Sequence, residues 1–308
     1  MTLDIVVPTY NRSDLLRRTI QSVQRAEKPR DLLVKLIVVD NNCTDGTEQL
    51  VKAMSLDSPV PIVWVRETSQ GLSSARNGGI AAGNGELIGF IDDDEEIQRN
   101  WLKVVEREFS DPDVEFIGGP CVPRWGAAPP DWLPRTMPAV IGVVEAQPRS
   151  PYDAKFPGIL MGGNAVLRRS VFEHVGGYDV RLGRTKKGLL SMEDDEFYQR
   201  LLSARIKGVH APDLVIEHFI PPVRLTKKYH RSWCFWHAVT EGSLFLRKPR
   251  PVVRLFGIPR YLFGEAARAL VHMPALWITG RRRDALEREM ALWQLAGFAY
   301  GRYLFHGN

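Results

Sequence analysis

The chain has 308 residues, of which 44% are hydrophobic and 25% are charged, so it is long enough to bury a sizeable core. This composition excludes a disordered chain and a multi-pass membrane protein. The formal net charge of +5 is unevenly distributed, because residues 224–308 carry 15 Lys or Arg against 5 Asp or Glu, and a basic region of this kind suits nucleic acid, an acidic partner or an anionic membrane leaflet.

The first 120 residues alternate short β-branched runs with helical patterns, which predicts βαβ units and a mostly parallel sheet. We expect strands at 3–7, 34–40, 62–65, 86–91 and 114–117, and helices near 14–25, 47–54, 73–82 and 100–109. The carboxyl end of each strand leads into a polar loop, and ligands bind at that edge of open parallel sheets.

Residues 119–160 are rich in proline, which predicts a loop-rich excursion over the sheet. The α/β pattern then resumes, with a helix after Ser191 and a short strand at 213–217. From about residue 223 the chain has a pattern of helices rich in Trp, Phe, Leu and Arg. We therefore predict a catalytic domain over residues 1–222 and a basic, amphipathic helical region over residues 223–308.

The N-terminus and the cysteines favour a cytoplasmic protein, or one bound peripherally to the cytoplasmic face of a membrane. Asp4 interrupts what would have to be the apolar core of a signal peptide. Cys43, Cys121 and Cys234 are odd in number and form no C-x-x-C pair, which favours a reducing compartment and argues against a thiolate metal site.

Five successive acidic residues, Asp92 to Glu96, directly follow the apolar run that ends at Ile91. Carboxylates clustered at the end of a buried strand repel one another unless a cation neutralises them. Asp92 and Asp94 are two residues apart, so a turn could present both to one divalent ion. The alternative is a solvated acidic loop, since charge runs are usually solvated.

Three other segments place polar residues after successive strands. Asn11 follows the first strand and could hold a nucleotide, Asp40 ends the second and could pair with the N–H edge of a pyrimidine, and Arg76 lies in the third helix. Each alone has an ordinary explanation, as a helix cap or a surface residue. Together they indicate a ligand site on one sheet edge.

Four motifs follow one another along the chain: PTYNR (8–12), VVDNNCTDGT (38–47), GLSSARNGGI (71–80) and GELIGFIDDDEEI (85–97). In this order and spacing they resemble the family 2 glycosyltransferases of GT-A fold. The resemblance covers roughly residues 3–245. It implies a GT-A nucleotide-sugar-binding fold, a nucleotide-diphosphate donor with a UDP-sugar expected first, Mn²⁺ or Mg²⁺ as cofactor, and inversion at the anomeric carbon. The donor-binding residues that we assign on this resemblance are Pro8, Thr9, Tyr10, Asn11, Arg12, Asp40, Arg76, Asp92, Asp93, Asn164 and Glu193.

The segment Met192-Glu193-Asp194-Asp195 resembles the part of the family that supplies the general base. A helix N-terminus holds a carboxylate ionised, which is the form that accepts a proton, so Asp194 is the expected catalytic base and Asp195 the second choice. Ser191 and Asp194 also match a capping box. The resemblance further implies the metal ligands Asp92, Asp94 and His218, although a lone histidine is more often an ordinary core or surface residue.

We therefore predict a metal-dependent inverting glycosyltransferase that acts on a hydroxyl of a glycan or lipid-linked acceptor in polysaccharide or glycoconjugate biosynthesis. The alternative is a catalytically silent nucleotide-sugar-binding protein at the membrane, against which the Asp triplet and Glu193-Asp194 argue. No G-x-G-x-x-G follows the first strand, which disfavours a dinucleotide-dependent oxidoreductase. Nucleic acid is not an expected partner.

The longest uncharged window in the basic region, residues 269–280, is too short to span a membrane and contains Pro274. With Arg281 to Arg283 beside it, and with the stretch 244–256, it predicts a helix lying on an anionic membrane surface. The alternative is a helical hairpin that packs on the catalytic domain or forms a homodimer. Trp125 and Trp132 are expected either over the acceptor side of the site or in ordinary packing.

Overall fold

The computed structural model describes residues 1–134, 138–184, 189–247 and 252–305, and it divides into two compact units. The first, called the sheet unit, comprises Met1–Arg124, Val143–Val180 and Glu193–Phe219. The second, called the helical unit, comprises Trp125–Gly142, Arg181–Met192 and Ile220–Asn308. Two segments that precede residue 222 in the sequence thus belong to the helical unit, while the boundary at residue 222 stays a prediction.

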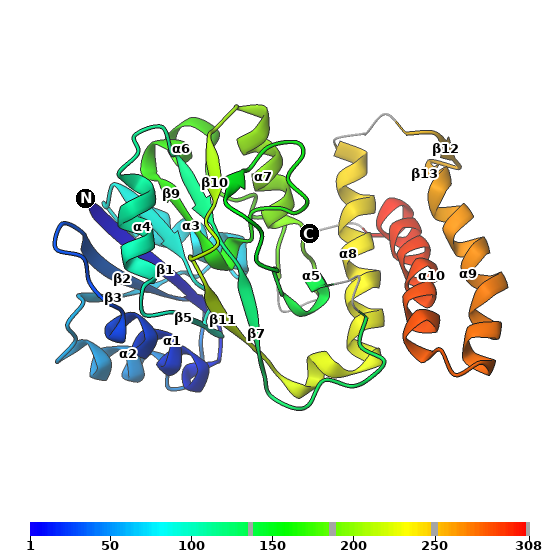
Figure 1. Cartoon of the computed structure of the whole chain (residues 1–308), viewed down its shortest axis with the longest axis horizontal. Helices are drawn as coiled ribbons and strands as arrows, with labels where there is room; N and C mark the ends of the chain where they lie inside the picture. Colours follow the sequence, from blue (N-terminus) through cyan, green and yellow to red (C-terminus); the bar gives the residue numbers. More distant parts are fainter. Residues whose placement is uncertain (135–137, 185–188, 248–251, 306–308) are drawn as a thin grey trace. The chain divides into compact units, whose positions relative to one another are not determined.

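The sheet unit is built on an eight-stranded sheet with the order β3-β2-β1-β4-β9-β6-β10-β8 (Figure 1). Its pairs are parallel except those made by β9 with β4 and β6 and by β8 with β10, so the predicted mostly parallel sheet is confirmed. The strands are β1 (Thr2–Thr9), β2 (Leu33–Asp40), β3 (Ile62–Arg66), β4 (Leu87–Phe90), β6 (Phe116–Gly118), β8 (Ser150–Pro151), β9 (Ala165–Arg168) and β10 (Gly208–His210).

Helices bury both faces of this sheet, which explains why its central strands are continuously apolar. In β1, Leu3, Ile5 and Val7 point into one buried cluster and Val6 into the other, as the two-residue period of a strand requires. The first cluster includes side chains of α1 (Ser13–Arg25), α2 (Thr47–Ser55) and α4 (Trp101–Phe109). The second includes side chains of α3 (Leu72–Ala82), α6 (Arg169–Val175) and α7 (Glu193–Ser203).

A second, three-stranded sheet has the order β5-β11-β7. Its strands are β5 (Glu95–Ile97), β11 (Ile216–Ile220) and β7 (Cys121–Trp125). The sequence pattern predicted only β11, and it placed that strand three residues too early, at 213–217. The antiparallel register places His218 opposite Glu95. This pairing brings a histidine from late in the chain onto the acidic segment that follows β4.

The helical unit contains three long helices: α8 (Lys227–Arg247), α9 (Arg260–Ile278) and α10 (Arg282–Tyr303). It also contains α5 (Pro138–Ile141), a 3-10 turn at Pro222–Leu225, and a hairpin of β12 (Arg254–Leu255) and β13 (Ile258–Pro259). In this unit α10 packs along both α8 and α9 and lies between them (Figure 1). Among the described residues, no helix is long and apolar enough to cross a membrane.

Two glycines of α10 and Gly242 of α8 let these helices approach closely. A Cβ atom added at Gly297 would lie 2.2 Å from the carbonyl oxygen of Phe235, and one at Gly301 would lie 2.1 Å from that of Val239. Both obstacles are backbone atoms, so a side chain at either position would push the helices apart.

We expect Gly301→Ala to lower the free energy of unfolding by about 1–3 kcal/mol, the usual cost of overpacking. Gly264→Ala is the matched control, because Gly264 lies within α9 and nothing approaches its added Cβ within 4 Å. The control should gain about 0.5–1 kcal/mol from helix propensity. Urea unfolding followed by circular dichroism measures both, and equal stabilities would refute the close approach of α8 and α10.

Candidate active site

The acidic segment forms a tight turn at the carboxyl end of β4. The backbone N–H of Glu95 donates to the carbonyl of Asp92 at 3.1 Å, and the N–H of Asp92 donates to Glu95 Oε2 at 2.8 Å. The hydroxyl of Thr19 donates to the carbonyl oxygens of Asp93 and Glu95. Asp93, Asp94 and Glu95 are each only 5% exposed, so the alternative of a solvated acidic loop is wrong.

Arg12 partly neutralises two of the buried carboxylates. Arg12 Nη1 donates to Asp93 Oδ1 and to Asp94 Oδ2, each at 3.0 Å. The hydroxyl of Thr9 donates to Asp93 Oδ2 at 2.8 Å. Burial raises the pKa of Asp93 to about 6, although Arg12 opposes the shift. Asp93 and Asp94 therefore share one arginine, an acidic surrounding that suits the binding of a further cation.

The buried guanidinium of Arg76 joins two segments that are far apart in the sequence. Its Nη2 atom donates to Asp92 Oδ1 at 3.2 Å, and its Nη1 atom donates to Asp194 Oδ1 at 2.8 Å. Arg76 is 1% exposed, and burial alone would lower its pKa, but Asp194 and Asp92 keep the pKa well above the ordinary value. The acidic segment and the start of α7 therefore meet at one sheet edge, as expected from the motifs.

Asp194 is held on both carboxylate oxygens, since the N–H of Gly162 donates to its Oδ2 atom at 3.0 Å. A Cβ atom at Gly162 would lie 2.3 Å from Asp194 Oδ1 and 2.4 Å from Arg76 Nη1, so a side chain there would displace these two groups. The Asp194 side chain is 15% exposed. The predicted base is thus oriented by protein groups and still accessible.

The predicted capping box does not form. Helix α7 begins at Glu193, with Met192 at a φ of 75° before it. The Ser191 hydroxyl hydrogen-bonds His237 Nδ1 at 2.9 Å, and the Ser191 N–H donates to the Thr240 hydroxyl. The carboxylate of Asp194 is therefore not used to cap the backbone of Ser191.

Of the three predicted metal ligands, the structure brings Asp94 and His218 together. His218 Nε2 lies 3.6 Å from Asp94 Oδ1, both residues are 5% exposed, and the N–H of Phe219 donates to the carbonyl of Asp94 at 2.8 Å. Asp92, the third predicted ligand, turns its Oδ1 atom to Arg76. Buried carboxylate and imidazole groups in an acidic surrounding fit a divalent cation.

Sequence reasoning missed two neighbours of His218. Glu95, Cys121 and His218 each offer a ligand atom, and these atoms lie within 4.8 Å of one another. Burial raises the pKa of Glu95 well above its usual range, and Asp92 and Asp94 add to the shift. Only the pairing of β5 with β11 and β7 creates this group, so no motif in the sequence indicated it.

The predicted donor-binding residues of β1 and β2 lie side by side, because Pro8 pairs with Val39 and Thr9 with Asp40. Tyr10 and Asn11 follow β1 directly. Asp40 is 4% exposed, and its Oδ1 atom accepts the N–H of Cys43 at 2.7 Å. The chain order reverses at β1, which has β2 on one side and β4 on the other, and such switch points form ligand crevices.

The side chains of the exposed Asn11 and the buried Asn164 both hydrogen-bond to other groups of the protein. Asn11 Oδ1 accepts the N–H of Thr44 at 2.7 Å. Asn164 accepts the indole N–H of Trp101 at 3.0 Å and donates to the carbonyls of Pro120 and Leu214, and it is 1% exposed. Glu193, the remaining donor-binding candidate, is 8% exposed at the start of α7 and helps to keep Arg76 charged.

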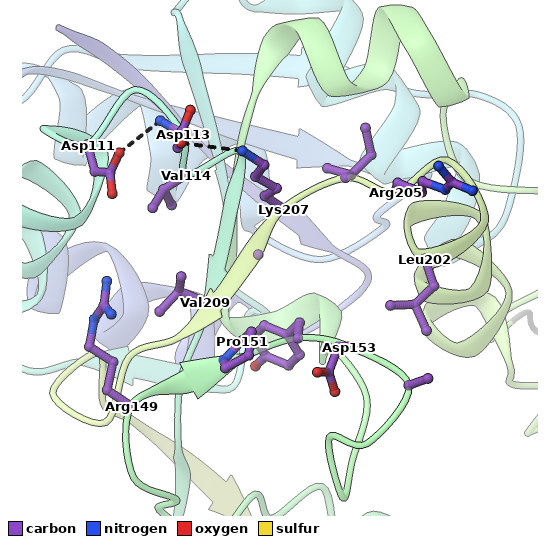
Figure 2. Close-up of a pocket in the computed structure, with 14 residues that line it drawn as sticks. Asp111, Asp113, Val114, Arg149, Pro151, Asp153, Leu202, Arg205, Lys207 and Val209 are labelled. Atoms are coloured by element: carbon purple, nitrogen blue, oxygen red, sulfur yellow. Dashed lines mark hydrogen bonds and ion pairs between the residues drawn. The ribbon is translucent and has the colours of Figure 1, made fainter.

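Trp132 packs in the helical unit with Trp233 against Cys234, Leu286 and Met290, which matches the ordinary-packing alternative. Trp125 is 37% exposed at the end of β7. The sheet unit also holds a pocket of about 540 Å³, shown in Figure 2, whose lining includes none of the predicted site residues. Its charged lining residues are Asp111, Asp113, Arg149, Asp153, Arg205 and Lys207.

Residues 4–176 match the family model for Glycosyl transferase family 2. The chain is 29% identical over 195 residues to the glucosyl-dolichyl phosphate glucuronosyltransferase of Haloferax volcanii, covering 60% of this chain and 58% of that protein. It is 24% identical over 251 residues to the succinoglycan biosynthesis protein ExoM of Rhizobium meliloti, covering 80% of this chain and 76% of that one.

Among solved structures, the mannosyltransferase PcManGT from Pyrobaculum calidifontis, in complex with GDP-Man and Mn²⁺, superposes with a TM-score of 0.66 at 21% identity. The match covers 98% of this chain and 87% of that one. The matched region spans less than two thirds of the Haloferax protein.

We expect Asn164→Ala to lower the free energy of unfolding by roughly 2–4 kcal/mol, because it leaves the buried Trp101 N–H and two buried carbonyls without their partner. Asn84→Ala is the control, since Asn84 is exposed and its amide oxygen accepts a hydrogen bond from the side chain of Lys35. Urea unfolding compares the two variants. An unchanged stability for Asn164→Ala would leave donor binding as the better explanation of this residue.

Proposed function

The chain belongs to Glycosyl transferase family 2 and has the GT-A fold, and from this premise we propose a metal-dependent inverting transfer of a sugar from a nucleotide-diphosphate sugar to an acceptor hydroxyl. The observation that carries the proposal is the Arg76 bridge. The buried guanidinium of Arg76 pairs with Asp92, which we expect next to the donor diphosphate, and with Asp194, the expected base. A donor-binding half and a proton-accepting half are thus fixed to each other.

Asp94 and His218 would hold the Mn²⁺ or Mg²⁺ ion, with Asp92 nearby. The bound ion would offset the negative charge that grows on the leaving diphosphate. Thr9 and Asp40 at the ends of β1 and β2 would face the nucleoside. A UDP-sugar is the expected donor, and the structural neighbour's complex with GDP-Man and Mn²⁺ makes a GDP-sugar the first competitor to test.

Asp194 would accept the proton of the acceptor hydroxyl as that oxygen attacks the anomeric carbon from the face opposite the diphosphate. Arg76 and the Gly162 N–H bind one carboxylate oxygen each, so they orient the carboxylate that would act as the general base. A single displacement inverts the anomeric centre and needs no covalent enzyme intermediate. No serine or cysteine nucleophile is required for this chemistry.

The acceptor is proposed to be lipid-linked or a glycan. The name of the Haloferax relative includes a dolichyl phosphate-linked sugar, and that of the Rhizobium relative includes succinoglycan biosynthesis. The basic region beyond residue 223 supports a place at the cytoplasmic face of an anionic membrane, where lipid-linked acceptors are concentrated.

We expect Asp194→Asn to keep donor affinity and to lose transfer by about 10²–10⁴-fold, because a neutral amide cannot accept the hydroxyl proton. Asp195→Asn is the matched comparison and should retain most of the turnover. Product formation from UDP-sugars and GDP-sugars with Mn²⁺ measures both variants. If Asp195→Asn is the inactive one, the base is Asp195; if the native chain binds donors and transfers none of them, the protein is a silent binder.

We expect Asp94→Ala to weaken the Mn²⁺-dependent binding of a nucleoside diphosphate by at least about tenfold, which is the lower end of the losses seen when a metal site is disturbed. Asp213→Ala is the control, because Asp213 is 56% exposed and pairs with Arg107 on the surface. Calorimetric titration with Mn²⁺ and with a chelator measures the effect. Metal-dependent affinity that survives in Asp94→Ala would remove this residue from the metal site.

A further inference from the structure

Helix α9 exposes an apolar face where a helix of a globular protein normally carries polar side chains. Its inner face buries Leu262, Ala266 and Ala269, and α10 packs on the helix. The opposite face, at the 100° spacing of a helix, carries no charged side chain over four turns. Its residues are all exposed: Gly264, Ala267, Val271, Pro274, Ala275 and Ile278. Val271 is 72% exposed and Ile278 is 86% exposed.

The hairpin that leads into α9 also exposes apolar side chains. Phe256 and Gly257 form its two-residue turn, with φ values of 49° and 68°. A bulky residue at positive φ is unusual, since such turns favour Asn and Gly. The Phe256 ring is nevertheless 78% exposed, while its carbonyl accepts the hydroxyl of Tyr303 on α10. The ring of Phe256 thus gains little packing within the helical unit in return for its strained backbone, which suggests that the ring contacts something outside the unit.

Positive charge surrounds these exposed apolar groups. Residues 252–283 contain six arginines and one acidic residue, Glu265. Arg260 lies at the start of α9, Arg268 beside the apolar face and Arg282 just beyond its end, and all three are exposed. Apolar side chains combined with arginine are typical of a surface that enters the headgroup region of an anionic bilayer.

We propose that the outer face of α9 and the β12–β13 hairpin dock on an anionic lipid surface, with Phe256 inserted among the headgroups. This inference rests on the proposed function, which places the acceptor at a membrane. It extends the expected interfacial helix by the β12–β13 hairpin, whose turn inserts into the lipid headgroups. A second copy of this chain is the less suitable occupant. In a two-fold interface the same arginines would face one another and repel.

Phe256→Asn in the full chain provides the sharpest test, because asparagine tolerates the positive φ and preserves the turn. We expect this variant to partition roughly tenfold less onto vesicles of phosphatidylcholine and phosphatidylglycerol, because it no longer buries an aromatic ring in the lipid. Ile278→Glu should lose more of this partitioning, and raised salt should weaken the binding of the native chain to the vesicles. Leu56→Asn is the matched control, since Leu56 is 81% exposed in the sheet unit, and it should bind like the native chain.

Co-sedimentation measures vesicle binding, and sedimentation velocity without lipid measures the oligomeric state. Equal vesicle binding by the native chain and by Phe256→Asn and Ile278→Glu would overturn the proposal. The proposal would also be overturned if the native chain is a dimer, these variants are monomers and their vesicle binding is unchanged. The face would then be assigned to self-association. Mn²⁺-dependent binding of a nucleoside diphosphate should persist in both variants. A failure of the catalytic proposal, seen as turnover that survives Asp194→Asn, would leave the vesicle result unaffected.

Discussion

The organisation of the candidate site depends on one buried cation, the guanidinium of Arg76. It contributes one N–H group to Asp92, which follows β4, and another to Asp194 at the start of α7. Burying an arginine without partners is costly, and removing one partner of a buried pair leaves an uncompensated charge at a cost of about 3–5 kcal/mol. The two carboxylates and Arg76 therefore require one another, and this mutual requirement fixes the distance between the expected donor and acceptor sides.

The small sheet has a similar effect on the proposed metal site. The antiparallel pairing of β5 with β11 brings His218 opposite Glu95 and within 3.6 Å of Asp94. Hydrogen bonds from Thr19 and Arg12 hold the acidic turn against repulsion between its own carboxylates. The turn is thus stabilised by Arg12, Thr19 and β11 in addition to its own Asp92–Glu95 hydrogen bonds, which is why it can remain strongly acidic and buried.

The helical unit combines tight internal packing with an apolar exterior. Gly297 and Gly301 allow backbone contact between α8 and α10, whereas α9 presents aliphatic side chains outward along its length. A helix that is apolar on two opposite faces has two surfaces to cover. Packing on α10 covers one of them, and the proposed lipid surface would cover the other.

The sequence determined the α/β architecture, the positions of the early strands and helices, and the polar residues at the carboxyl edge of the sheet. It could do so because period-two apolar runs and strand-to-helix loops are local properties. It did not reveal that Glu95 and Cys121 join His218, that Asn164 bonds to Trp101, or that Ser191 pairs with His237 and not with Asp194. Those contacts join residues far apart in the chain, and only strand pairing and burial, which are tertiary properties, decide which side chains meet.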